Sequence, residues 1–399
     1  MRVEPPEQVD PSGVRDRKGT VASNLSRNDI WLLCAGVLFS AGSAAGRYSH
    51  AGRIFPFVVS AAALGTLAAI VGRSVDRLGD RLGSGTTGVV QSALGNLPEL
   101  FFGIFALRAG LVRVVQAALI GSIVGNVLLV LGLAFIVGGL RHGTQRFSAE
   151  SARLVAVQLL LAVAVLMIPT LGAHFDPAVS SHRTALSEIA AVVLLTVFVL
   201  STPRSMRREQ RPSPEDVAKG EMTVAPQNEQ DTVPILGEND PKVPVAAWSV
   251  QLVITVLLAS SVASAFVADW FVDALSPALS VMHMSEAFAG LVVVAIAGNA
   301  VENVVGVQLA ARNRADYALS VILQSPVQIA LVLMPFLVLI SGPLGGAQLT
   351  LVLSPSLAVV LVLTTLVATV VVLDGESTWL EGVCLVALYI VIAASFWWG

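Results

Sequence analysis

The sequence predicts an all-α polytopic membrane protein with about 11 transmembrane helices. Of its 399 residues, 13% are charged and 55% are hydrophobic, whereas a soluble domain carries roughly 25% charged residues. The apolar residues lie in long runs separated by short polar breaks, so they cannot all belong to one oversized core. A polar motif also occurs twice, inside two of the apolar runs. Together these observations predict a helical membrane bundle that contains an internal repeat.

The chain begins with a polar tail, residues 1–29, which contains basic residues and prolines but no apolar stretch like that of a cleaved signal. After this tail, each run of about 20 apolar residues predicts one spanning helix. The eleven predicted spans cover residues 30–48, 54–72, 83–107, 112–140, 151–172, 184–202, 246–268, 285–311, 316–341, 347–373 and 379–398.

The distribution of basic residues predicts the orientation of the chain, because Lys and Arg accumulate on the cytoplasmic side of a membrane. A cytoplasmic N-terminus places 19 of the 24 Lys and Arg residues inside and 5 outside. We therefore expect a multi-pass protein of a bacterial-type cell (inner) membrane, with a cytoplasmic N-terminal tail. The net charge of -3 offers no basic surface, so nucleic acid is not an expected partner.

One long hydrophilic interruption, residues 203–245, divides the spans and lies on the cytoplasmic side in this orientation. Eight acidic residues stand between Glu209 and Asp240, against the two basic residues Arg211 and Lys219. Two interpretations fit this composition: a solvated linker that cannot fold, or a loop that senses cations.

The repeated motif reads Gly-Asn-x-x-Glu, in GNLPELFFGIFALR from Gly95 and in GNAVENVVGVQLAAR from Gly298. In each copy a second polar pair follows about one helix later. The matched positions, separated by 203 residues or in the last pair by 202, are Gly95/Gly298, Asn96/Asn299, Glu99/Glu302, Ser122/Ser325 and Asn126/Gln328. A duplication explains this shared order better than chance.

The two motif helices are five spans apart, an odd number, so they must cross the bilayer in opposite directions. The expected plan is therefore 1 + 5 + 5, with two inverted-topology repeats, an arrangement found in transporters with a binding site near the midplane. The segments are a leading helix at 30–50, a first repeat at 51–202 with its motif at 95–132, the acidic loop at 203–245, and a second repeat at 246–399 with its motif at 298–341.

Helical spacing places Asn96 with Glu99, and Asn299 with Glu302, on one face of each motif helix. A carboxylate at mid-membrane costs about 3 kcal/mol on insertion scales, so two of them need a compensating partner. A hard cation such as Ca²⁺ provides one, because it binds carboxylate, amide, hydroxyl and backbone oxygens.

The glycines of both motifs, together with Pro98, are expected to loosen the helices and free carbonyl oxygens for such a cation. The alternative for the two Glu residues is a pair of protonated acids that bridge packed helices. The alternative for Ser122, Ser325 and Asn126 is polar packing between helices.

These motifs resemble those of the cation/Ca²⁺ exchanger superfamily, and most closely those of its cation/proton exchanger branch. The resemblance extends from about residue 54 to the end and includes DGESTWLEG at 374–382. It implies that Glu99 and Glu302 bind the cation, with help from Asn96, Asn299 and nearby carbonyl groups. It also matches Asn126 and Gln328 to the polar positions of the next helix, and Asp76 to an acidic position that assists proton access. The alternative for Asp76 is an ordinary interfacial charge.

The sequence departs from that branch at Asn303, where a His is usual, and at Gln324-Ser325-Pro326, where Gly-Ser-Ser is usual. Sodium-coupled members usually carry an acid where Gln328 stands, so its amide favours proton coupling.

We therefore expect a secondary-active antiporter in which Ca²⁺ and H⁺ compete for Glu99 and Glu302, with no cofactor. A Na⁺/Ca²⁺ exchanger is the alternative, and an ion channel is a distant one. Nothing in the sequence matches an HExxH or nucleophile motif, so an enzyme is not expected. The sequence leaves the oligomeric state open.

Overall fold

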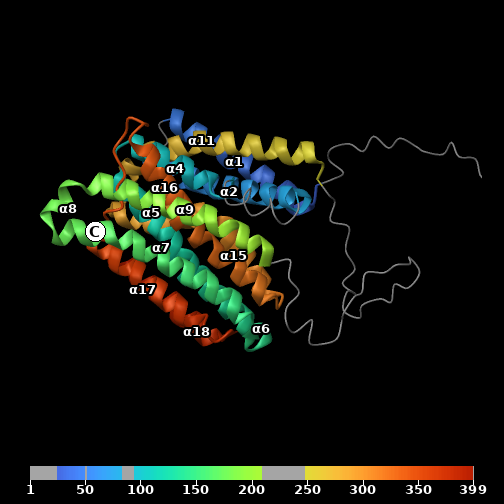
Figure 1. The fold of residues 1–399 in the computed structure, drawn as a ribbon. Coiled ribbons are helices and arrows are strands. Elements are labelled where there is room, and N and C mark those ends of the chain that lie inside the picture. Colours follow the sequence, from blue (N-terminus) through green and yellow to red (C-terminus); the bar gives the residue numbers. More distant parts are fainter. Residues whose placement is uncertain (1–24, 50–51, 83–93, 209–247, 399) are drawn as a thin grey trace, which may run out of the picture.

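The computed structural model describes residues 25–49, 52–82, 94–208 and 248–398, apart from the side chains of residues 76, 79–82, 202–208 and 301–302. Most of the expected acidic loop at 203–245 and most of the N-terminal tail lie outside this part of the chain, and residues 203–208 continue a helix that begins at Arg183. In the described residues the protein is a bundle of helices with one two-stranded ribbon (Figure 1).

The first half of the bundle precedes the acidic loop. Its elements are α1 (Arg27–Tyr48), α2 (Ile54–Leu82), α4 (Leu97–Arg108), α5 (Val112–Val124), the π-helix η2 (Gly125–Val130), α6 (Leu131–His142), β1 (Gln145–Arg146), α7 (Ala149–Phe175), α8 (Pro177–Ser181) and α9 (Arg183–Arg208).

The second half follows that loop. Its elements are α11 (Val250–Met282), α12 (Glu286–Phe288), η3 (Ala289–Val294), α13 (Ala295–Gly298), α14 (Ala300–Ala311), α15 (Ala315–Gln328), η4 (Ile329–Leu333), α16 (Met334–Ser341), α17 (Pro355–Val371), β2 (Glu376–Ser377) and α18 (Trp379–Phe396).

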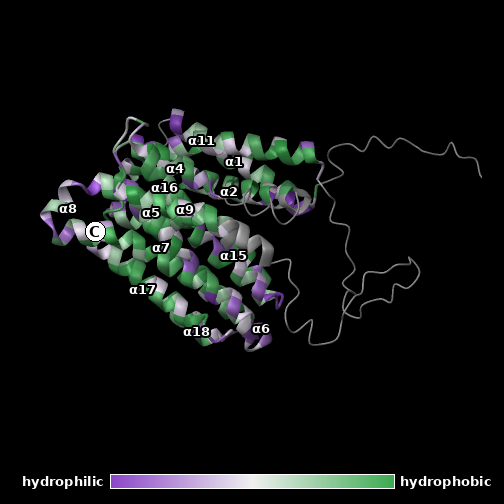
Figure 2. Cartoon of the chain, in the orientation of Figure 1, coloured by the Kyte–Doolittle hydropathy of each residue, from purple (hydrophilic) through white to green (hydrophobic). Residues whose placement is uncertain are grey.

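The polytopic helical class is confirmed, although the count of eleven stays a prediction. In the described part of the chain, eight helices are long and apolar enough to span a membrane. Two further segments, Glu286–Gly298 and Asn303–Ala311, meet at a 60° bend and are either one broken span or a re-entrant loop. Helix α17 is a shorter apolar helix. The predicted span at 83–107 is described only from residue 94. Figure 2 shows hydrophobic residues along the helices, with hydrophilic residues concentrated near the ends.

Several helix ends differ from the expected positions for identifiable reasons. Helix α1 begins at Arg27, three residues early, because Ser26 and Asp29 form a capping box. Helix α11 continues to Met282 rather than ending at 268. The apolar run stops at Asp269, but Asp269 is exposed and so does not interrupt the helix.

Three helices form a layer on one side of the bundle: α1, α2 and α11 pack against one another, while α7 and α17 pack together on the opposite side (Figure 1). Between these two groups of helices run the two most buried spans, Val112–His142 and Ala315–Ser341. In an apolar stretch of 18 residues in each span, 78% and 72% of the residues are buried. These two spans carry the second polar pair of each repeat. The polar positions therefore lie in the best-shielded part of the molecule.

The contacts between the halves follow a two-fold pattern. Helix α6 packs on α18 while its repeat counterpart α16 packs on α9, and the counterparts α2 and α11 pack on each other. The connecting loops follow the same pattern: Gln145 Nε2 donates to the Ala310 carbonyl oxygen at the end of α14, and Ala347 N donates to the Leu107 carbonyl oxygen at the end of α4. Each half thus satisfies the last carbonyl groups of the other half's motif helix.

Candidate cation site

Both motif segments break their helices at the Asn residue. Asn96 precedes α4 with φ −95° and ψ 20°, and Asn299 precedes α14 with φ −89° and ψ 27°. These similar dihedral angles lie outside the α-helical region, and the two residues occupy equivalent positions of the repeat. Pro98 lies in the first turn of α4, where its missing N–H breaks no helical hydrogen bond. It starts the helix rather than loosening it from within.

Each motif Glu lies in the first turn after this break. Glu99 belongs to the first turn of α4, and its side chain is 8% exposed. Glu302 occupies the equivalent place in α14, but its side chain is outside the described part of the structure. The N-terminus of a helix carries a partial positive charge, which favours a nearby carboxylate. The fold thus lowers the cost of burying a charged Glu99.

The side chain of Glu99 lies against the second motif. A Cβ atom built on Gly298 would lie 2.8 Å from Glu99 Oε1 and 3.0 Å from its carboxyl carbon. Gly298 ends α13, immediately before the break at Asn299. The carboxylate of one repeat therefore occupies space that only a glycine of the other repeat leaves open.

Hydrogen bonds between amide side chains also join the two repeats. Asn96 Nδ2 donates to Gln328 Oε1 at 3.3 Å, and Asn126 Nδ2 donates to Asn299 Oδ1 at 3.0 Å and to Ser325 Oγ at 3.2 Å. All five side chains are buried. Asn126, on η2, is 1% exposed, and its Oδ1 has no hydrogen-bond partner among the described residues. That oxygen is a candidate ligand for a cation.

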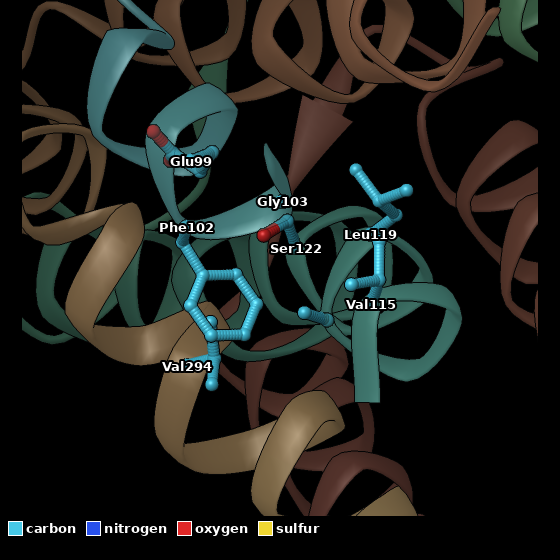
Figure 3. Close-up of a pocket in the computed structure, with 8 residues that line it drawn as sticks. Glu99, Phe102, Gly103, Val115, Leu119, Ser122 and Val294 are labelled. Atoms are coloured by element: carbon cyan, nitrogen blue, oxygen red, sulfur yellow. The ribbon is translucent and has the colours of Figure 1, made fainter. Parts of the chain in front are cut away.

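Ser122 lies beside Glu99 rather than within this hydrogen-bonded group. Both line a narrow pocket of about 10 Å³, together with apolar residues that include Phe102 and Val294 (Figure 3). Gly95 lies in the turn before Asn96. The structure thus gathers Glu99, Asn96, Asn126, Gly298, Asn299, Ser325 and Gln328 around one centre, with Ser122 next to Glu99.

Two further residues, Asp76 and Asn303, remain to be placed relative to the centre. Asp76 lies on α2, and its side chain is not described. Asn303, in place of the usual His, lies in the first turn of α14, with its Nδ2 3.5 Å from the Ile296 carbonyl oxygen on the other side of the break. This long contact spans the bend between α13 and α14.

Three π-helical segments lie next to the polar positions, and no pattern in the sequence predicted them. Segment η2 contains Asn126, η4 begins directly after Gln328, and η3 ends just before α13. A π-helical turn alters the regular i to i−4 pairing of backbone groups and often marks a functional site. The first two occupy equivalent positions in the repeats, so the irregular backbone is duplicated together with the side chains.

A model of one family, described as sodium/calcium exchanger protein, matches residues 53–205 and 252–398. A Ca²⁺/H⁺ antiporter of Aphanothece halophytica is 31% identical over 361 residues, which cover 90% of this chain and 94% of the relative.

Solved structures give the same result. The crystal structure of the Ca²⁺/H⁺ antiporter protein YfkE has a TM-score of 0.75 at 25% identity, with 92% of this chain and 99% of that one covered. A structure of the sodium-calcium exchanger NCX_Mj has a TM-score of 0.51 at 19% identity, covering 90% and 99% of the two chains, and is similar in fold alone.

Proposed function

Because the chain belongs to the sodium/calcium exchanger protein family, we propose that it is a secondary-active antiporter that exchanges Ca²⁺ for H⁺ at the centre built around Glu99. The observation that carries this proposal is the contact of the Glu99 carboxylate with Gly298, since it places an acid of one repeat at the broken helix of the other. Relatives named Ca²⁺/H⁺ antiporter support the choice of ions.

The chemistry of this centre suits a hard divalent cation as the transported substrate. Glu99 supplies a carboxylate, and Asn126 supplies an amide oxygen that accepts no hydrogen bond from the described residues. Glu302 supplies the second negative charge in this proposal, from the equivalent turn of α14. Two carboxylates neutralise Ca²⁺, and amide and backbone oxygens bring the ligand number toward the six to eight that Ca²⁺ prefers.

Competition between the two ions couples their movements. A site with two ionised carboxylates and no cation is strongly disfavoured in a medium of low dielectric constant. The protein without Ca²⁺ therefore changes from one conformation to the other only after protons have replaced Ca²⁺ on the two acids. The inverted repeats provide two related conformations, one open to each side of the membrane.

Gln328 favours protons over Na⁺ as the coupling ion. Its amide is buried and accepts a hydrogen bond from Asn96, so this position adds no third negative charge to the centre. A sodium-coupled exchanger must neutralise additional cations at the same place, which this neutral pair does not do.

Flux into sealed vesicles tests the proposal. An imposed pH gradient should drive Ca²⁺ uptake in the absence of Na⁺, and Glu99→Gln or Glu302→Gln should reduce that uptake to the level of protein-free vesicles. The variant Glu188→Gln makes the same substitution at an exposed position and serves as a control for insertion and folding. Uptake that requires a Na⁺ gradient would overturn proton coupling, and non-saturating flux without a counter-ion would indicate a channel.

A further inference from the structure

A second cavity lies between α1, α2 and α11, and its lining shares no residue with the pocket beside Glu99. Its volume is about 270 Å³, and its lining includes Arg47, Arg53, Ser60, Trp270 and Asp273. Its distance along α1 from Asp29 is about 27 Å, at 1.5 Å per residue for the 18 residues that separate Asp29 from Arg47. This is close to the roughly 30 Å thickness of the bilayer hydrocarbon. Arg47 and Arg53 flank the connection between the spanning segments Arg27–Tyr48 and Ile54–Val75, so we place this rim of the cavity at the depth of the lipid headgroups.

One of the two arginines that line the cavity has no acidic partner among the described residues. Arg47 forms an ion pair with Asp273, with 2.9 Å between Nη2 and Oδ2. Arg53 is exposed and forms no ion pair with any described residue. The cavity therefore carries a net charge of +1, which matches the single negative charge of a phosphodiester. A guanidinium group also fits phosphate oxygens geometrically, because it donates two parallel hydrogen bonds.

The surroundings of the cavity suit a lipid rather than a soluble anion. Trp270 lines the cavity, and its ring makes an edge contact with Tyr48 at 6.5 Å between centroids. Trp and Tyr are enriched at headgroup depth. On α11, Phe266 is exposed, and its ring centroid lies 6.3 Å from that of Trp270. On α2, Phe55 and Val58 are exposed and lie in the first two turns after Arg53. These side chains offer an apolar surface for acyl chains.

Beneath these charges, Ser43 and Ser60 join α1 to α2. Both side chains are fully buried, and their hydroxyl oxygens are 2.6 Å apart. Both residues belong to the cavity lining. The cavity thus has a fixed polar floor and a charged rim, with walls that come from three different helices.

We propose that this cavity binds the headgroup of an anionic phospholipid, with the phosphodiester on Arg53 and Arg47 and the acyl chains along α2 and α11. With the N-terminus in the cytoplasm, this lipid belongs to the outer leaflet. A lipid bound here fastens the leading helix α1 to α2 and α11. This assignment does not depend on which ions the protein transports.

Native mass spectrometry of the purified full chain in detergent tests the assignment, with phosphatidylglycerol and phosphatidylcholine added in parallel. Phosphatidylglycerol should bind more tightly than phosphatidylcholine. Arg53→Gln should weaken phosphatidylglycerol binding about tenfold, the loss expected for one charge-assisted contact. Asp273→Asn frees Arg47 and should strengthen it. Arg183→Gln, an exposed arginine outside the cavity lining, should leave it unchanged.

The reverse results would overturn the proposal. Equal binding of the two lipids, or equal loss in Arg53→Gln and Arg183→Gln, would show that the cavity does not select the headgroup. Displacement of phosphatidylglycerol by millimolar inorganic phosphate, with an Arg53-dependent rise in melting temperature from phosphate alone, would assign the cavity to a soluble anion instead. Melting temperature without added ligand identifies any variant that fails to fold.

Discussion

At the residue scale, the centre depends on which side chains are small as much as on which are charged. Gly298 leaves the space that the Glu99 carboxyl group occupies. Gly125, next to Asn126 on η2, has no described atom within 4 Å of where a Cβ would lie. An alanine at Gly298 would therefore crowd the Glu99 carboxylate, whereas an alanine at Gly125 would not. Comparing the two variants separates the effect of displacing this carboxylate from the effect of replacing any glycine near the centre by alanine.

Replacing Gly298 by Ala should displace the Glu99 carboxyl group and abolish most Ca²⁺ transport. The reason is steric, since the new methyl group would lie 2.8 Å from Oε1. We expect a loss of about tenfold or more, equivalent to one weakened cation ligand. Initial rates of Ca²⁺ flux in proteoliposomes measure it. Gly125→Ala is the matched control and should retain normal flux, and equal flux from both variants would contradict the placement of Glu99.

At the element scale, the two halves meet through a very close crossing of α5 and η3. A Cβ on Gly121 would lie 2.3 Å from the Leu291 carbonyl oxygen, and one on Gly290 would lie 2.5 Å from the Val114 carbonyl oxygen. These neighbours are backbone atoms, so they cannot yield by changing rotamer. Small residues at such crossings allow membrane helices to approach closely.

Gly121→Ala should therefore destabilise the whole protein rather than only slow transport. We expect a loss of about 1–3 kcal/mol in the free energy of unfolding, typical of overpacking. Thermal unfolding in detergent, followed by the loss of monodisperse protein, provides the measurement. Gly125→Ala, four residues further along the same span, again serves as the control. A melting temperature for Gly121→Ala equal to that of the control would show that the crossing is looser than described.

The positions of most helices were predictable from the sequence, because membrane spans are marked by apolar runs of about 20 residues. The repeat was readable because Gly95 and Gly298, and Ser122 and Ser325, keep one spacing. The π-helical segments η2, η3 and η4 could not be predicted, because their residues belong to the same apolar runs as the ordinary α-helices. The contacts of Asn126 with Asn299 and Ser325 also depend on tertiary packing, which spacing along one helix does not determine.

At the scale of the whole molecule, the two-fold pattern of contacts relates the halves, and the distribution of charge predicts their orientation in the membrane. The loop that carries Thr144 belongs to the side with most Arg and Lys residues. The α7–α9 connection, which carries Ala178 on α8, belongs to the opposite side. Thr144 and Ala178 are both exposed. They are therefore suitable positions for a direct test of orientation.

In a background with Cys34 and Cys384 replaced by Ala, Ala178→Cys should react with an impermeant maleimide added to intact cells. Thr144→Cys should react only after the membrane is permeabilised. The physical basis is the retention of Arg and Lys on the cytoplasmic side. Labelling of Thr144→Cys in intact cells would reverse the proposed orientation and place the N-terminus outside.

Isothermal titration of Ca²⁺ into the purified protein, at several pH values and in two buffers of different ionisation enthalpy, tests most directly whether Ca²⁺ and protons share Glu99 and Glu302. Ca²⁺ should bind more tightly as the pH rises, and protons should be released when it binds at low pH. Glu99→Gln and Glu302→Gln should each abolish this binding. Ca²⁺ affinity that is independent of pH, without proton release, or binding that survives loss of either acid, would contradict a shared site.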